Sequence, residues 1–194
     1  HWVAILEITT PVALSGTLEA YWGAIFTTMS FLTTTGFISE SWPEAQNWSG
    51  LTTPGLILMG LALVGGGVAT TAGGVKLLRV YALYLQGLGE VQRLVHPSVV
   101  VGRKSEARIR RKGAQIAWVV FMLFAMSIAV VSMILALLGV GFEDAFVLAI
   151  AALTTTGPLI TSAAEMPIDL VSQSDAVKLV LTTTMVVARL ETLA

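Results

Sequence analysis

The residues whose types could do chemistry form a short motif that occurs twice. Residues 32–36 read Leu-Thr-Thr-Thr-Gly, and the same five letters recur 121 residues later at 153–157. Glycine lets a strand turn its backbone carbonyls toward an axis, which a bulky side chain would resist. Rings of such carbonyls replace the water around a partly dehydrated cation. The repeated motif therefore predicts a cation filter made of backbone oxygens, with no carboxylate required.

We expect the backbone of residues 34–37 and 155–158 to coordinate the ion. The candidate filter residues are Thr34, Thr35, Gly36, Phe37, Thr155, Thr156, Gly157 and Pro158. For either copy alone, the alternative is a helix with a glycine C-cap whose threonines bond back to their own helix. Two copies in matching contexts favour the filter. The triplet at 182–184 has no following glycine, and we expect it only to bond back to its helix.

Short apolar segments must position the two motifs. Residues 18–32 and 143–153 are apolar, but they are too short to span a bilayer and are typical of helices that dip into it. The C-terminal end of such a helix carries about half a negative charge, which favours a cation. Each motif is followed by a polar, acidic loop and then by another apolar segment. The same unit thus occurs twice: a spanning helix, a short helix, the filter motif, an outer loop and a second spanning helix.

The composition indicates a membrane protein. Apolar residues make up 55% and charged residues 12% of the 194 residues, and the charged share is about half of that usual in soluble domains. Nine of the eleven Lys and Arg residues lie between Lys76 and Lys112, and such basic segments face the cytoplasm. Both filter motifs then enter from outside. The chain has no cysteine, which excludes disulfides and thiolate metal sites.

Two long apolar stretches predict membrane-spanning helices. Residues 114–141 carry no charge and would extend about 40 Å as a helix. Residues 51–86 are interrupted by five glycines within 65–74, so we expect two half-helices around an unwound loop. Irregular backbone at membrane depth is tolerated only where protein or a water-filled cavity surrounds it.

The predicted organisation is two repeats joined by a linker, cut from a longer chain because both ends fall within apolar patterns. The first repeat (1–86) has a truncated first helix at 3–14, a pore loop at 18–37 and the broken helix at 51–86. A basic cytoplasmic linker occupies 87–113. The second repeat (114–194) has a helix at 114–141, a pore loop at 143–158 and a truncated helix at 176–194.

Five motifs together resemble the TrkH/KtrB (Trk/Ktr/HKT) potassium uptake family. They are the two filter motifs, the loop 70–76 (Thr-Thr-Ala-Gly-Gly-Val-Lys), residues 93–97 (Arg-Leu-Val-His-Pro) and residues 188–191 (Ala-Arg-Leu-Glu). Ala188 stands where the family commonly has glycine. The resemblance implies the third and fourth of the family's four repeats. It implies an all-α membrane protein with two helix–pore-loop–helix repeats, half of a pseudo-fourfold, potassium-channel-like pore.

The resemblance also implies a gate below the filter. The unwound loop would be that gate, and Arg189 would project into the pore at a similar depth; the repeat offset of 121 independently pairs Arg189 with position 68, inside the loop. The gate residues are Gly65, Gly66, Gly67, Gly73, Gly74, Lys76 and Arg189. The alternatives are an Arg189 that snorkels to the cytoplasmic interface near Glu191 and a Lys76 that serves as a cytoplasmic anchor.

The function implied is potassium uptake across the plasma membrane, most simply a bacterial inner membrane, by a multi-pass protein that is not an enzyme. Potassium is the transported ion, and no cofactor is covalently bound. The expected partners are the lipid bilayer, the missing N-terminal repeats, a cytosolic nucleotide-binding regulatory subunit and a second copy in a homodimer, but no nucleic acid. One glycine per motif offers few stacked sites, so we expect loose discrimination against sodium.

Two other functions remain open from the sequence. A secondary transporter would use residues 65–74 as a broken-helix substrate site and the threonine motifs as turns; many such transporters have inverted repeats, whereas the basic linker puts both motifs here on one side. A degenerate half-protein without transport is the other. Pore-loop repeats encoded upstream would remove it.

Overall fold

The chain is all-helical in the residues that the computed structural model describes, which are 11–50, 53–67, 70–95, 104–163 and 168–191. No strand occurs among them. The helices in chain order are α2 (Pro11–Leu32), α3 (Trp42–Ser49), α4 (Pro54–Val64), α5 (Leu77–Val95), α6 (Lys104–Leu137), α7 (Phe142–Thr154), α8 (Leu159–Ser162) and α9 (Asp175–Glu191).

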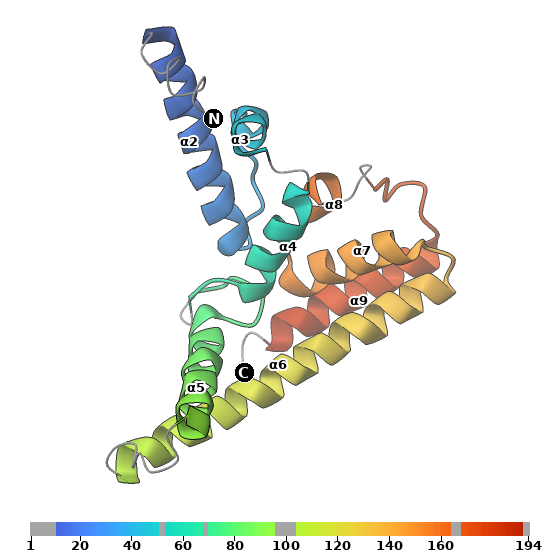
Figure 1. The fold of residues 1–194 in the computed structure, drawn as a ribbon. Coiled ribbons are helices and arrows are strands. Elements are labelled where there is room, and N and C mark those ends of the chain that lie inside the picture. Colours follow the sequence, from blue (N-terminus) through green and yellow to red (C-terminus); the bar gives the residue numbers. More distant parts are fainter. Residues whose placement is uncertain (1–10, 51–52, 68–69, 96–103, 164–167, 192–194) are drawn as a thin grey trace.

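Helices α6, α7 and α9 pack side by side as one group (Figure 1). The short helix α7 is the centre of this group, because every residue from Val147 to Thr154 is buried. The apolar positions of α7 therefore have partners on several sides, as expected for a helix that is hydrophobic all round. This burial fixes the end of α7, where the second filter motif begins.

The first filter motif is held by a different set of contacts. Helix α2 packs against α3 and α4, and α4 reaches across to α7 and α8. At the end of α2, the fully buried Phe31 joins the same apolar cluster as Leu58 of α4 and Leu148 of α7. Helix α5 lies against α6 (Figure 1). The apolar cluster thus ties the ends of α2 and α7 to one core.

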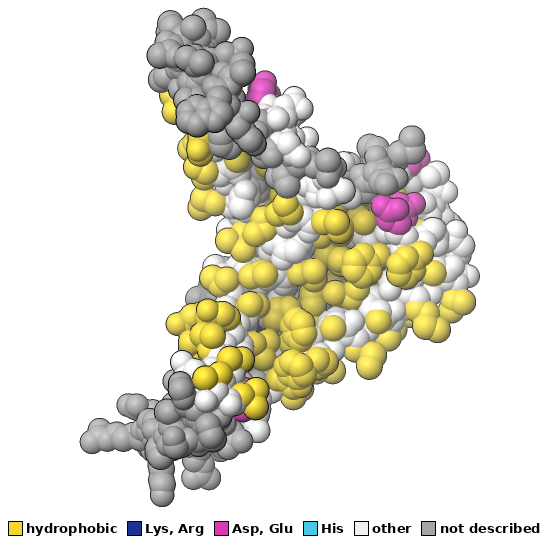
Figure 2. All heavy atoms as spheres, viewed as in Figure 1, with side chains coloured by type: hydrophobic (Ala, Val, Ile, Leu, Met, Phe, Trp, Pro, Cys, Tyr) yellow, Lys and Arg dark blue, Asp and Glu magenta, His cyan; other side chains and the backbone are white. Residues whose placement is uncertain are grey.

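The surface carries the large apolar side chains that lipid would cover. Within the described residues, one helical segment, Gly113–Leu137, is long and apolar enough to cross a membrane, and only 17% of its most apolar window is buried. Exposed apolar side chains cover a wide area of the view in Figure 2. Trp22 and Met29 on α2 are also more than half exposed. Soluble monomers rarely expose contiguous apolar patches of this kind.

The helices differ from those expected from the sequence mainly in where they begin and end. Helix α6 begins at Lys104 and α5 continues to Val95, so both enter the segment 87–113 that was expected to be a linker. Lys, Arg, Gln and Glu are good helix formers, and they do not stop a helix that leaves the membrane. The segment expected as a short helix at 18–32 belongs to a helix that already includes Pro11, a residue tolerated in a first turn.

Some predicted segments lie partly outside the described residues. They are the start of the truncated helix at 3–14, residues 51–52 and 68–69 of the broken helix, 96–103 of the linker and 192–194 of the last helix. Residues 68–69 also belong to the loop 65–74 that was expected to be the gate.

Candidate functional site

Both filter motifs begin with the same backbone turn. In each copy the second threonine has φ of 56°, and two amides bond back to the preceding helix. These bonds are Thr34 N to Phe31 O (3.1 Å) and Thr35 N to Ser30 O (2.9 Å) in the first copy, and Thr155 N to Ala152 O (3.3 Å) and Thr156 N to Ala151 O (3.0 Å) in the second. The pattern is a Schellman motif. The sequence repeat is therefore a structural repeat.

Threonine, and not glycine, takes the left-handed position in this turn. Thr34 and Thr155 are β-branched, and a β-branched residue with positive φ is a genuine outlier. Such conformations cost about 1–3 kcal/mol each and cluster at functional sites. The glycine C-cap considered from the sequence is not found at either helix end. The same left-handed threonine therefore occurs in both motifs.

After the turn the two motifs diverge. Gly36 has φ of 85°, and residues 36–39 that follow are irregular and not helical. Gly157 is outside the left-handed region, and Pro158, with φ of −63° and ψ of −9°, leads directly into α8. Proline is favoured at such a helix start. The second motif therefore presents a shorter non-helical segment than the first.

The two motifs contact each other although 121 residues separate them. The Thr156 hydroxyl lies 3.5 Å from the Thr34 carbonyl oxygen, to which it donates a long hydrogen bond. A Cβ atom on Gly36 would lie 2.8 Å from Pro158 Cδ and 3.0 Å from Thr156 Cγ2. Thr156 is fully buried. The fold therefore brings the two candidate filter segments side by side.

The glycine-rich segment forms a closed loop between α4 and α5. Its neck is joined by two backbone hydrogen bonds, from Val75 N to Leu63 O (2.9 Å) and from Leu77 N to Gly66 O (3.1 Å). Close to this neck, the Gly73 amide donates to the Thr34 hydroxyl at 2.9 Å. Gly73 also packs against the backbone of Thr154. The loop therefore contacts both filter motifs.

Two cationic side chains hold three consecutive carbonyls of this loop. Lys76 Nζ donates to the oxygens of Thr70 (2.7 Å) and Ala72 (3.1 Å), and Arg189 Nη1 donates to the Thr71 oxygen between them at 2.9 Å. Lys76 is only 5% exposed. Both side chains thus bond to the loop.

A cavity of about 510 Å³ brings together the first filter motif, the loop and α9. Its lining residues are Thr33, Thr34, Thr35, Thr71, Ala72, Thr155, Thr182, Met185, Val186 and Arg189. Three of the candidate filter residues therefore line it. Gly36, Phe37, Thr156, Gly157 and Pro158 do not, and among the gate residues only Arg189 does.

The candidate residues taken from the sequence did not include six of these lining residues, Thr33, Thr71, Ala72, Thr182, Met185 and Val186. On α9 the signal was present, because Thr182, Met185 and Arg189 recur at the three- and four-residue spacing of one helix face. The triplet at 182–184 does bond back to its helix, with hydroxyl-to-carbonyl distances of 2.8, 3.0 and 2.8 Å. That prediction is confirmed, and Thr182 lines the cavity in addition.

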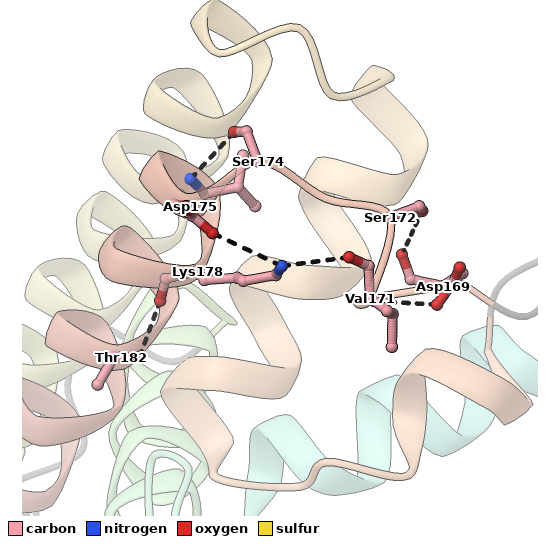
Figure 3. A network of polar contacts seen from close by, with 8 residues as sticks. Asp169, Val171, Ser172, Ser174, Asp175, Lys178 and Thr182 are labelled. Carbon is pink, nitrogen blue, oxygen red and sulfur yellow. Dashed lines mark hydrogen bonds and ion pairs between the residues drawn. The ribbon is translucent and has the colours of Figure 1, made fainter.

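A polar network fixes the N-terminal end of α9 (Figure 3). Lys178 Nζ donates to the Val171 carbonyl at 3.2 Å and lies 3.8 Å from an Asp175 carboxylate oxygen. The Val171 amide donates to the Asp169 side chain at 2.9 Å. Lys178 is 44% exposed, and an exposed ion pair contributes little stability. The network instead ties the preceding loop to the helix that lines the cavity.

The cavity offers hydroxyl and carbonyl oxygens, the ligand type of hard monovalent cations. Among the residues that the structure describes, no group of three or more His, Cys, Asp or Glu side chains could hold a metal ion. An all-helical fold in which the ends of two helices and an irregular loop meet at one polar cavity is that of a pore-loop membrane protein.

The comparisons with known proteins agree with this class. Residues 7–194 match the TrkH family, described as a cation transport protein. The Trk system potassium uptake protein TrkH of Escherichia coli K12 is 33% identical over 174 residues, which cover 87% of this chain and 33% of that protein. TrkH of Halomonas elongata is 31% identical over 176 residues, 90% of this chain and 35% of that protein.

A solved structure shares the fold. The crystal structure of the potassium transporter TrkH from Vibrio parahaemolyticus superposes with a TM-score of 0.72 at 26% identity, over 97% of this chain and 38% of that chain. This chain belongs to the TrkH family of cation transport proteins, as its motifs predicted. Transport, and not enzyme catalysis, is the function of the family. The chain spans about a third of the length of the relatives that it matches.

Proposed function

We propose that this chain forms half of a potassium-uptake pore in a bacterial inner membrane. The backbone of residues 34–37 and 155–158 lines a selectivity filter, and the loop 65–74 with Arg189 controls passage beneath it. One observation carries the proposal: both filter motifs, the loop and Arg189 border a single polar cavity of about 510 Å³. Potassium is proposed because the relatives are potassium uptake proteins by name.

The helix ends support the cation path. Helices α2 and α7 end at the two motifs with the same turn, so the partial negative charges of both C-termini act on one region. Inverted repeats would direct the two helix ends to opposite sides of the membrane. Two helix C-termini beside one cavity therefore favour a pore over a broken-helix substrate site.

The loop supports a gate because it lies against the filter and is held from two sides. Its Gly73 amide bonds to the Thr34 hydroxyl, while Arg189 reaches its Thr71 carbonyl from α9. A segment without helical hydrogen bonds, attached by a few side-chain contacts, is a low-cost element to move. The loop is therefore suited to open and close the path below the filter.

The rest of the proposal extends to parts that the chain does not contain. Two pore loops supply half of a fourfold ring, so two further repeats complete the pseudo-fourfold pore. The basic segment 87–113 faces the cytoplasm, where a nucleotide-binding regulatory subunit acts on the gate, and a second copy forms a homodimer. With one glycine per motif, the filter discriminates only loosely against sodium.

The experiment uses two neighbouring threonines that face different surroundings. Thr182 lines the polar cavity, whereas Thr183 lines a different and more apolar pocket with Leu123 and Met126 of α6. The chain has no cysteine of its own. In the full-length protein, freed of cysteines elsewhere, Thr182→Cys and Thr183→Cys are therefore a matched pair of probes.

We expect Ag⁺, a monovalent cation that reacts with thiols, to inhibit potassium uptake by Thr182→Cys about tenfold or more, because a silver ion bound in the cavity would block the proposed path. Excess potassium should slow this inhibition, and Thr183→Cys should be unaffected. Uptake is measured as rubidium or potassium entry into potassium-starved cells. Equal sensitivity of the two variants, or insensitivity of Thr182→Cys, would contradict the cavity as the cation path.

A further inference from the structure

The contact between Pro158 and Gly36 has a feature that the filter assignment does not use. A Cβ on Gly36 would lie 2.8 Å from Pro158 Cδ and 3.0 Å from Pro158 Cγ, so the proline ring occupies the space that a side chain would need. Pro158, Thr156 and Gly36 do not line the cavity, whereas Thr34 and Thr155 do. The proline ring therefore separates the two filter segments outside the cavity wall.

The repeat gives this contact a direction. With the offset of 121, the equivalent of Pro158 is Phe37 and the equivalent of Gly36 is Gly157. Phe37 is 65% exposed, and a Cβ on Gly157 would meet nothing within 4 Å. Pro158, the residue after the glycine of the second motif, thus packs on Gly36, the glycine of the first motif. The equivalent positions at the two ends of this pair, Phe37 and Gly157, are left without such a contact. A head-to-tail contact of this kind closes into a ring when it is repeated by rotation.

Proline is suited to hold a distance. Its ring fixes φ near −65°, the observed value is −63°, and the ring has no rotamers to exchange. The adjacent Thr156 adds a methyl group 3.0 Å from the same Cβ position of Gly36, and this residue is fully buried. The spacing of the two filter segments is therefore set by rigid, packed groups.

We propose that Pro158 is a positioning residue that sets cation selectivity. Its ring fixes the spacing between the two neighbouring filter segments, and so fixes how closely their carbonyl oxygens can approach an ion. This inference rests on the proposed function. Discrimination between potassium and sodium depends on the size of the carbonyl cage or on the rigidity and field strength of its oxygens. The spacing of the two filter segments changes the cage size and the field, so it affects selectivity on either account.

The test is a selectivity ratio in the full-length protein. Pro158→Ala removes the ring atoms next to Gly36, and we expect sodium uptake relative to potassium uptake to rise about fivefold or more, a change equivalent to about 1 kcal/mol. Pro158→Val keeps branched apolar bulk and should return the ratio toward that of the unchanged protein. Pro43→Ala, at an exposed proline in the first turn of α3, should leave the ratio unchanged.

A second variant keeps the test valid if Pro158→Ala fails to accumulate. Thr156→Ser deletes the methyl group beside Gly36 and keeps the hydroxyl near the Thr34 carbonyl, and it should shift the ratio in the same direction. If these variants lower sodium and potassium uptake by the same factor, the spacing role is overturned. The silver assay on Thr182→Cys separates the two ideas, since it reports the cation path whether or not the ratio moves.

Discussion

Replacing Gly73 with alanine is expected to eliminate potassium uptake by the full-length protein. The added Cβ would lie 2.6 Å from the carbonyl carbon of Thr154 and 3.0 Å from its Cα, and it would overlap the carbonyl oxygen. Real Cβ atoms essentially never approach other atoms as closely as 2.6 Å. The obstacle is backbone, which cannot rotate away as the end of a flexible side chain could.

The displacement would act on both filter motifs. Gly73 packs on Thr154 of the second motif, while its amide donates to the Thr34 hydroxyl of the first at 2.9 Å. Moving the loop away to accommodate the methyl group breaks that hydrogen bond and leaves the buried Thr34 side chain without its donor. Moving α7 instead disturbs the most buried helix of the chain. Either adjustment removes the arrangement that the filter needs.

The matched control is Gly67→Ala in the same loop. There the Cβ would meet only Thr70 Cγ2, at an ordinary van der Waals distance of 3.7 Å, so we expect at least half of the unchanged uptake. Growth of a potassium-uptake-deficient strain at low potassium and the amount of protein in the membrane are measured for both. Near-normal growth of Gly73→Ala, or equal loss in both variants, would refute the predicted contact between loop and filter.

Much of the helix order could be predicted, because it depends on local composition. Five glycines in ten residues weaken a helix wherever they occur, and α4 and α5 accordingly lie on either side of them. The ends of the helices were harder to predict. Neither the charges before Gly113 nor Pro11 stops a helix, since charged side chains favour helices and proline is tolerated in a first turn.

The site was predictable only where a short motif carries it. The repeated Thr-Thr-Thr-Gly letters identified two equivalent turns, but they did not show that threonine takes the left-handed position. They also suggested two equivalent segments, whereas Pro158 starts a helix and Phe37 does not. The proline was visible in the sequence. Its meaning depended on the Gly36 segment, which only the fold brings beside it.

The roles of the two cations could not be decided from the sequence. Lys76 and Arg189 each had an interfacial alternative, because a long side chain near a helix end can reach several directions. In the structure both side chains bond to the loop, but from different elements. Lys76 belongs to the loop and bonds within it, whereas Arg189 belongs to α9 and bonds across to it. Removing Arg189 therefore leaves the internal support of the loop in place.

The second large effect is expected from Arg189→Ala, which should raise cation flux through the full-length protein about tenfold or more. The variant frees the Thr71 carbonyl from α9, so the loop keeps its Lys76 support but loses its attachment to the cavity wall. It also removes a positive charge from the cavity. Two unit charges about 4 Å apart repel by roughly 4 kcal/mol at an effective dielectric constant of 20, so the arginine is an electrostatic barrier as well as an attachment.

The flux is best measured in proteoliposomes that hold the full-length protein and no cytosolic partner, with rubidium as the tracer ion. Lys178→Ala is the control, because it removes a cation from the same helix at a site 44% exposed and bonded to the outer loop. It should change the flux by less than about twofold, as exposed ion pairs contribute little. A flux that stays unchanged in Arg189→Ala, while Lys178→Ala behaves as expected, would mean that the arginine neither holds the loop nor repels the ion. The gate would then have to be sought in the loop alone.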